Sequence, residues 1–277
     1  MPAKRNRAWL YPHTAERNYQ RLLVSYVDEF SKETLAHLKG LELLRMDGWS
    51  DDLAAAILYL LTRALTAGQR LTARLPAIYA QVNQYNDKQF RAVTKAGTGL
   101  EIGPSGTFPP GSVPYGNVSD PRQIRARFGV GVDVYRSEPW LAQAQTNWVA
   151  SNTSLIKSIP EQHMQRVEQI IRNGVLEGES SASLAKKIQA AGGVTKRRAT
   201  LIAEDQIGKA NGELTRFRQT ELGIEEYTWV TSHDERVRES HRARDGKVYR
   251  WDKPPAGGSH PGIEIKCRCH ASPVFPD

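Results

Sequence analysis

Long apolar runs are missing from this sequence of 277 residues. The chain contains no stretch of about 18 apolar residues, which a membrane-spanning helix would require. Its N-terminus, Met1 to Arg7, is basic, but it is not followed by the apolar segment of a signal peptide. We therefore expect no membrane span and no signal peptide, and we expect the protein to be made in a cytosol.

Cysteine is almost absent as well. The two cysteines, Cys267 and Cys269, are separated by one residue. In an extended strand, side chains at positions i and i+2 share a face, with Cα atoms about 6.6 Å apart, which is poor geometry for a disulfide. The spacing therefore predicts a reduced pair rather than a disulfide-stabilised fold.

The overall composition excludes a wholly disordered chain. Hydrophobic residues make up 39% of the sequence and charged residues 25%, which is typical of a folded globular protein. The length allows one large domain or two ordinary ones, each with its own apolar core. The formal net charge of +8 favours contact with nucleic acid or with an acidic protein surface, without locating a site.

Residues 1–95 carry the spacing of amphipathic helices. Apolar residues recur at positions i, i+3, i+4 and i+7 in several successive segments. One predicted helix runs from Thr14 to Gly40, a second from Ser50 to Gly68, and a third begins near Pro76. The pattern predicts a helical hairpin or bundle in this N-terminal region.

Residues 96–121 are rich in glycine and proline, which recur every two to four positions. Neither a helix nor a central strand tolerates that density, so the segment is either a linker or extended arm, or an ordered long loop packed on its own domain. A short alternating run from Val130 to Tyr135 then indicates a strand.

Residues 122–277 are predicted to form one domain, with helices over 137–222 followed by a small sheet over 224–277. Helical spacing covers Trp140 to Ile156 and then Pro160 to Arg172, with an end at Gly174. A short helix from Ser181 to Ala191 is predicted to close at Gly192 and Gly193, and Thr195 to cap a longer helix that stops near Gly223.

The pattern changes to a period of two in residues 224–277, which predicts a small sheet. Tyr227, Trp229 and Thr231 alternate as a strand, and Asp245-Gly246 indicates a turn into a second strand over Lys247 to Trp251. A last strand is predicted to carry on one face Ile263, Ile265, Cys267 and Cys269. The aromatic residues Tyr227, Trp229 and Trp251 are interpreted as core residues. The expected fold class is α+β, mainly helical with a small C-terminal sheet module.

The last third of the chain carries a succession of motifs. In chain order they are Ile202-Ala203-Glu204-Asp205-Gln206 with Asn211, Gly223-Ile224 with Tyr227-Thr228-Trp229, Asp234-Glu235-Arg236-Val237-Arg238 with His241, Asp245-Gly246-Lys247, Pro254-Pro255, His260-Pro261-Gly262, and Cys267-Arg268-Cys269. This succession resembles the phage Mu protein F-like family of minor head, or head-morphogenesis, proteins, over about residues 140–277 and most strongly from Ala199 onward. The chain departs from the family pattern at Glu204, where members often carry a basic residue, and in the longer stretch between His260 and Cys267.

The resemblance implies a structural protein of tailed-phage head morphogenesis rather than an enzyme, so no catalytic residue is assigned. It implies a few copies per virion inside the capsid at the portal vertex, assembled in the host cytoplasm. The implied partners are the portal protein, the major capsid or scaffolding protein, and double-stranded DNA. The residues that carry the family motif are Asp205, Asn211, Trp229, Asp234, Arg236, Arg238, His241, Gly246, His260, Pro261, Cys267, Arg268 and Cys269.

Four of these residues form a candidate Cys2His2 set: His241, His260, Cys267 and Cys269. Thiolates and imidazoles are the ligands that zinc prefers at tetrahedral sites. A single residue between two cysteines is unusual for zinc, however, so two other interpretations stay open: buried hydrophobic thiols and a redox pair. No other cofactor is expected.

Two further functional hypotheses rest on charged residues. Asp234 and His241 would be the base and acid, or the metal ligands, of a metal-dependent nuclease or toxin-like enzyme; the alternative is a structural ion pair. A phosphate-binding surface for DNA would use Lys186, Lys187, Lys196, Arg197 and Arg198. Because acidic residues interleave with these, they also fit ordinary solvated helix faces. The N-terminal helices are the expected docking segment for the portal or a neighbouring capsid protein.

Overall fold

The computed structural model of the chain describes residues 10–40, 51–98 and 138–275. The chain forms two compact units, each assembled from segments that are far apart in sequence. The helical unit consists of Glu16–Ile78 and Asn147–Glu204, and the mixed unit of Met1–Ala15, Tyr79–Thr146 and Asp205–Asp277. Three predicted features lie outside the described residues: the helix start at Ser50, residues 99–121 of the Gly/Pro-rich segment, and the strand at Val130 to Tyr135.

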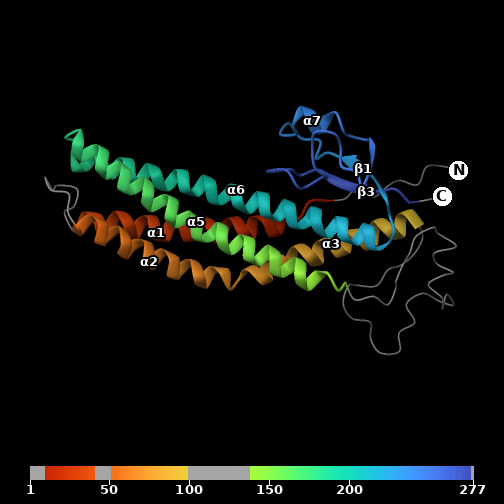
Figure 1. Cartoon of the computed structure of the whole chain (residues 1–277), viewed down its shortest axis with the longest axis horizontal. Helices are drawn as coiled ribbons and strands as arrows, with labels where there is room; N and C mark the ends of the chain where they lie inside the picture. Colours follow the sequence, from red (N-terminus) through yellow and green to blue (C-terminus); the bar gives the residue numbers. More distant parts are fainter. Residues whose placement is uncertain (1–9, 41–50, 99–137, 276–277) are drawn as a thin grey trace, which may run out of the picture. The chain divides into compact units, whose positions relative to one another are not determined.

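Long helices make up most of the described chain (Figure 1). They are α1 (His13–Gly40), α2 (Asp51–Thr72), α3 (Leu75–Thr98), α5 (Leu141–Leu176) and α6 (Ser181–Glu221). Together with a three-stranded sheet near the C-terminus, they confirm the predicted α+β class. None of the helices in these described segments is long and apolar enough to cross a membrane.

The interruption predicted between Ile156 and Pro160 is wrong, because α5 continues through Pro160 to Leu176. Ile156, Ile159 and Val167 are all buried, so one apolar face of the helix extends past the proline. Burial of this face outweighs the cost of the backbone hydrogen bond that Pro160 cannot form. The predicted helix end at Gly174 is also wrong. A methyl group at that position would overlap the side chain of Leu184, so the glycine permits close packing of α6.

The break predicted at Gly192 and Gly193 is likewise wrong, since both glycines lie inside the continuous helix α6. A methyl group at Gly192 would meet the side chain of Ser31 of α1 at 3.4 Å. Gly68, the predicted end of the second helix, lies inside α2, where a methyl group would come within 3.0 Å of the Tyr26 hydroxyl. Close helix packing therefore explains Gly68, whereas a methyl group at Gly192 would make an ordinary van der Waals contact.

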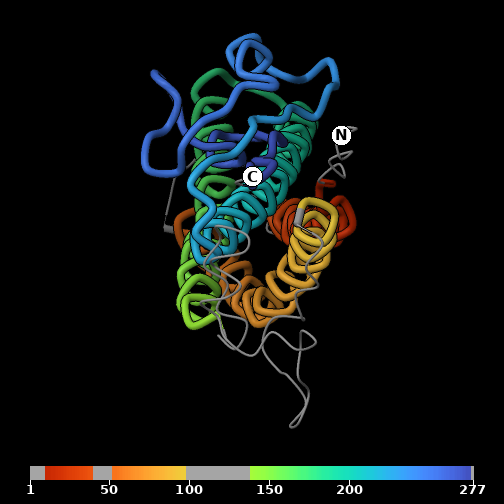
Figure 2. Tube along the Cα trace, turned by 90° about the vertical axis from the view of Figure 1, so that its right-hand side faces the viewer, coloured from red at the N-terminus to blue at the C-terminus, as the bar shows by residue number. Residues whose placement is uncertain are grey.

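In the helical unit, α1 packs against its three helical neighbours (Figures 1 and 2). The Tyr26 hydroxyl of α1 donates a hydrogen bond to the carbonyl of Ala64 of α2 (2.8 Å), and the Tyr19 hydroxyl donates to Oδ1 of Asn152 of α5 (2.8 Å). Lys196 of α6 forms an ion pair with Asp28 of α1. Buried apolar stripes with a few polar ties between helices therefore hold this unit together.

The mixed unit ends in a small module, residues 224–275, which we call the C-terminal module. It contains β1 (Glu226–Val230), the one-turn helix α7 (Glu239–Arg242), β2 (Val248–Arg250) and β3 (His270–Pro273). The sheet order is β2-β1-β3 with antiparallel pairing throughout, and Trp229 is opposite Ala271. Tyr227, Trp229 and Trp251 are buried in its core, as predicted.

The predicted last strand is wrong in position. Residues 263–269 form turns and loop, and the strand begins only at His270. Gly262 and Lys266 have positive φ angles of 86° and 58°, which interrupt an extended backbone. Ile263 and Ile265 are exposed while both cysteines are buried, so the four residues do not share one face.

The C-terminal module packs on the end of α6, where the blue and cyan segments meet in both views (Figures 1 and 2). A methyl group at Gly212 would lie 2.9 Å from the carbonyl oxygen of Pro261, and one at Gly208 would lie 3.1 Å from that of Cys267. The buried Gln219 of α6 donates to the carbonyl of Ala271 (2.9 Å) and accepts from Trp251 Nε1 (3.1 Å). The module is therefore fixed to α6 by close backbone approach and by a bridging amide.

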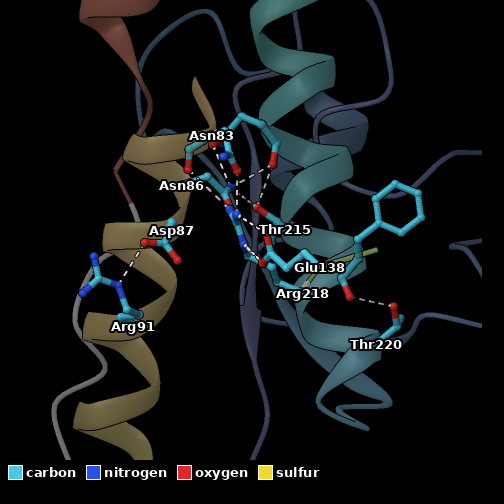
Figure 3. Close-up of polar contacts among 10 residues, drawn as sticks. Asn83, Asn86, Asp87, Arg91, Glu138, Thr215, Arg218 and Thr220 are labelled. Atoms are coloured by element: carbon cyan, nitrogen blue, oxygen red, sulfur yellow. Dashed lines mark hydrogen bonds and ion pairs between the residues drawn. The ribbon is translucent and has the colours of Figure 1, made fainter. Parts of the chain in front are cut away.

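A buried polar network joins α3 to α6 within the mixed unit (Figure 3). The Arg218 side chain, only 1% exposed, donates from Nε and Nη2 to the two carboxylate oxygens of Glu138 at 2.7 and 2.8 Å. Arg218 also donates to the amide oxygens of Asn83 and Asn86, both at 2.6 Å. This pairing compensates the buried guanidinium and ties three segments of the chain together.

Candidate metal centre

Three of the predicted metal ligands converge inside the C-terminal module. Nδ1 of His241 lies 3.6 Å from Sγ of Cys267 and 3.5 Å from Sγ of Cys269. All three donor atoms lie within 4.8 Å of one another, and all three residues are buried. We call them the Cys-His cluster. Both cysteines are free thiols, in agreement with the predicted reduced pair.

His241 is held by its surroundings in one orientation. It lies on α7, and its ring makes an edge contact with Trp229 at a centroid distance of 5.2 Å. Its Nε2 is 2.9 Å from the carboxylate of Glu264. A proton on Nε2 donated to that carboxylate leaves the lone pair of Nδ1 facing the two sulfurs, which is the arrangement a metal-binding imidazole needs.

Glu264 is ionised in this environment. Desolvation acts to raise its pKa, but the hydrogen bond from His241 and the charges of Arg238 and Arg244 outweigh it and lower the pKa of Glu264. Arg238 and Arg244 lie 3.4 and 3.6 Å from the carboxylate oxygens. Sequence analysis missed Glu264. The sequence does contain an indication of it, because Glu264 is an acidic residue in the longer stretch between His260 and Cys267. The prediction of a strand over this stretch did not bring it near His241.

The two sulfurs differ in acidity. A hydrogen bond from Cys269, aided by the backbone amide of Gly262, lowers the pKa of Cys267 to about 6 despite burial. That amide lies 3.4 Å from Sγ of Cys267. The hydrogen bond between the thiols and burial together raise the pKa of Cys269. Cys267 is therefore the sulfur that ionises first.

The fourth predicted ligand, His260, lies elsewhere in the module. Its Nδ1 is 2.8 Å from the hydroxyl of Tyr227, and its ring packs on Trp251 at a centroid distance of 5.0 Å. Burial, with the nearby charge of Arg216, lowers the pKa of His260. The structure therefore brings together three members of the predicted set and places His260 in the aromatic core.

Several other motif residues make contacts within the mixed unit. Asp205 of α6 accepts from Lys209 Nζ at 2.7 Å and from the backbone amide of Lys266 at 3.3 Å. Asn211 accepts from Asn86 through both its backbone and its side-chain oxygen. Arg268 lies over the ring of Tyr11, 5.7 Å from its centroid.

The motif residues of the β1–α7 and α7–β2 connections act locally. Asp234 accepts from the amide of the exposed Arg236 at 3.0 Å, which closes a turn. Arg238 donates to the carbonyl of Ile265. Gly246 adopts a φ of 73° and donates its amide to the carbonyl of Trp229 at 2.8 Å. A left-handed residue is needed at that turn, which accounts for the glycine.

The predicted DNA-contact residues lie on α6 in the helical unit. Lys187 forms an ion pair with Glu179, Lys196 forms one with Asp28, and Arg198 donates to the hydroxyl of Ser158 at 3.0 Å. Lys186 and Arg197 are exposed. Part of the predicted basic surface is therefore used in contacts within the unit.

Comparison with known proteins identifies the C-terminal part of the chain. Residues 165–272 match the family model described as "Phage Mu protein F like protein". The chain is also 38% identical over 153 residues to an uncharacterized protein of Haemophilus influenzae. That match covers 55% of this chain and 34% of the relative, so the chain spans about a third of the relative's length. No solved structure matches. Residues 165–272, which contain α6 and the Cys-His cluster, form a Phage Mu protein F-like domain.

Proposed function

We propose that the chain is a minor head protein of a tailed phage that acts in head morphogenesis at the portal vertex. The observation that carries this proposal is the match of residues 165–272 to the Mu F-like family, whose members are in general structural proteins of phage heads. The match runs from within α5 through α6 to β3, and so includes nearly the whole C-terminal module. The proposed place of action is the capsid interior.

The N-terminal helices are the proposed docking segment for the portal or the major capsid protein. On α2 the exposed fractions of Leu58 and Tyr59 are 66% and 48%, although neighbouring positions of the same helix are buried. Exposed apolar side chains on a rigid helix are suited to a helix-in-groove contact. A Leu58→Asp variant should lower recovery of the chain in purified heads, while a Leu176→Asp variant, exposed at 82% on α5, serves as the control.

A metal-dependent nuclease is the competing function, and the geometry does not favour it. Asp234 accepts the amide of Arg236 in a local turn, and His241 is buried facing two sulfurs. A nuclease site needs carboxylates that hold an accessible divalent cation next to DNA. Cleavage of DNA upon addition of Mg²⁺ or Mn²⁺, abolished by Asp234→Asn, would favour the nuclease over the assembly protein.

Contact with packaged DNA is a separate element of the proposal and rests on the basic residues of α6. Lys186 and Arg197 are exposed and free of the ion pairs that hold Lys187 and Lys196 in the described structure. Binding through phosphates should weaken steeply with salt, without regard to sequence. Charge reversal at Lys186 and Arg197 should reduce the salt dependence, whereas salt-independent retention of DNA would contradict this role.

The decisive experiment is mass spectrometry of purified virions and of empty capsid intermediates, combined with chemical crosslinking. We expect a few copies of the chain per particle, with crosslinks from α1 or α2 to the portal protein. Absence from both kinds of particle would reject the head-protein proposal. Presence at several hundred copies would instead indicate a major shell component.

A further inference from the structure

We propose that the chain binds one zinc ion through Nδ1 of His241 and the thiolates of Cys267 and Cys269. This inference goes beyond the role in head assembly, because it concerns what holds the C-terminal module in its fold. It rests on three independent observations: the spacing of the donor atoms, the groups that orient them, and the small amount of regular structure in the module.

The spacing of the donors agrees with one tetrahedral zinc ion. Zinc forms bonds of about 2.3 Å to sulfur and about 2.05 Å to nitrogen. At a tetrahedral angle these bonds place each sulfur roughly 3.6 Å from the nitrogen. The observed distances from His241 Nδ1 are 3.6 Å to Cys267 and 3.5 Å to Cys269. Both sulfur-nitrogen edges of the expected tetrahedron are therefore present.

The groups around the donors are those of a metal site. Glu264 accepts the Nε2 proton of His241, so the imidazole presents its unprotonated nitrogen to the sulfurs. The amide of Gly262 donates to Sγ of Cys267, which stabilises a thiolate. A carboxylate behind a ligating histidine and an amide directed at a ligating sulfur both fix and tune metal ligands.

Buried thiols without a metal explain this arrangement less well. The single lone pair of Nδ1 can accept one S–H donor well, yet two buried sulfurs lie at nearly equal distances from it. A cation at the centre would satisfy the nitrogen and both sulfurs together. In the described part of the chain, the group of candidate ligands consists of these three residues.

The module contains little regular structure around the cluster. Between β1 and β3 the chain contains only the four-residue α7 and the three-residue β2 as regular elements. Binding of a metal ion stabilises the folded arrangement of loops that carry its ligands. A zinc ion would join α7 to the loop at Cys267, whose backbone packs against Gly208 of α6.

The test is the zinc content of the full chain, purified under reducing conditions without chelator from cells supplied with zinc. We expect about one zinc per chain by elemental mass spectrometry, and a near-ultraviolet thiolate-to-metal band when Co²⁺ replaces zinc. The variants His241→Gln, Cys267→Ser and Cys269→Ser should lose the metal. The matched control is His260→Gln, which alters a half-buried histidine of the same module outside the cluster and should retain the metal.

Loss of metal by a misfolded variant is separated from loss of a ligand by work on the unaltered chain and on Glu264→Gln. A mercurial reagent that blocks thiols should release the zinc of the unaltered chain in proportion to the sulfurs modified. Glu264→Gln keeps all three ligands and should bind zinc about 10–100-fold more weakly. A metal-free unaltered chain that gives no Co²⁺ band, or a Cys267–Cys269 disulfide in the native protein, would overturn the proposal.

Discussion

The helical unit and the C-terminal module are stabilised in different ways. In the helical unit, apolar residues such as Leu23, Val27 and Leu60 are buried along whole helices, so stability is distributed over many turns. In the module, strands of five, three and four residues supply little regular structure, and a small aromatic core is joined to α6 by individual polar contacts. Single substitutions of polar residues should therefore have much larger effects in and around the module than on the surface of the helical unit.

The largest effect is expected at the buried ion pair of Arg218 and Glu138 in the mixed unit. Glu138→Ala would leave the guanidinium of Arg218 buried with only neutral partners, which should cost about 3–5 kcal/mol of unfolding free energy. Urea unfolding followed by circular dichroism measures this loss. Replacing both residues with methionine should recover most of it, since an apolar pair of similar size avoids the unpaired charge.

The control for this prediction lies in the helical unit. Glu168 pairs with Arg172 one turn along α5, and the side chains are 38% and 56% exposed. Exposed pairs of this kind contribute about 0.5 kcal/mol or less, so Glu168→Ala should change stability very little. Equal losses for Glu138→Ala and Glu168→Ala would show that the two regions do not differ as argued.

The difference between the helical unit and the C-terminal module also explains which structural features could be predicted from the sequence. The helices were predictable because a stripe of buried residues repeats over many turns, as around Tyr19, Leu23 and Phe30 of α1. The predicted helix end at Gly174 was wrong because this glycine serves close packing of helices, which a sequence does not reveal. The break predicted at Gly192 was wrong because α6 continues through it.

In the module, the residue types were sufficient to predict the set of candidate ligands, but not where the backbone places them. His241, Cys267 and Cys269 were identified as a set, yet alternation of apolar residues placed the cysteines on a strand that begins only at His270. The positive φ of Lys266 could not be predicted, because lysine rarely adopts it. The contact of His241 with Glu264 depends on that loop and was missed for the same reason.

Removal of the proposed zinc should affect the two regions unequally. After chelation of the metal under reducing conditions, the backbone amides of residues 226–273 should lose their protection from hydrogen exchange, while those of α1 and α5 should keep it. At a metal concentration 100 times the dissociation constant, the lost stabilisation corresponds to about 2.7 kcal/mol. Uniform loss of protection in both regions would contradict a role confined to the module.

Acid should weaken the helical unit through His163. Burial, with the charge of Arg166, lowers its pKa from 6.5 to about 4, and its Nδ1 lies 3.0 Å from the Thr195 hydroxyl, which itself donates to the carbonyl of Ala191. Because the folded state binds the proton less tightly than the unfolded state, stability is full above pH 6.5 and falls as the pH drops toward 4. The loss should be about 2 kcal/mol at pH 5.

The measurement for His163 is the unfolding free energy at pH 7 and at pH 5 for the unaltered chain and for His163→Gln. The variant is less stable at pH 7 because its amide fits the buried site less well, but it lacks the titrating ring and should lose about 2 kcal/mol less on acidification. An identical pH dependence in both proteins would show that other groups are responsible for the acid sensitivity.

Two glycines of α6 are expected to separate the two regions by the sign of the effect. Gly193 lies in the helical unit with no atom within 4 Å of an added methyl group, so Gly193→Ala should raise the unfolding free energy by about 0.5–1 kcal/mol through helix propensity alone. Gly212→Ala gains the same propensity, but its methyl group would lie 2.9 Å from the Pro261 carbonyl and force the module away from the helix, at a cost of about 1–3 kcal/mol. The midpoint temperature of thermal unfolding should therefore rise for Gly193→Ala and fall for Gly212→Ala, although both are the same substitution on one helix. If both variants are stabilised, the loop that carries Cys267 can shift freely, and the close backbone approach does not hold the module on α6.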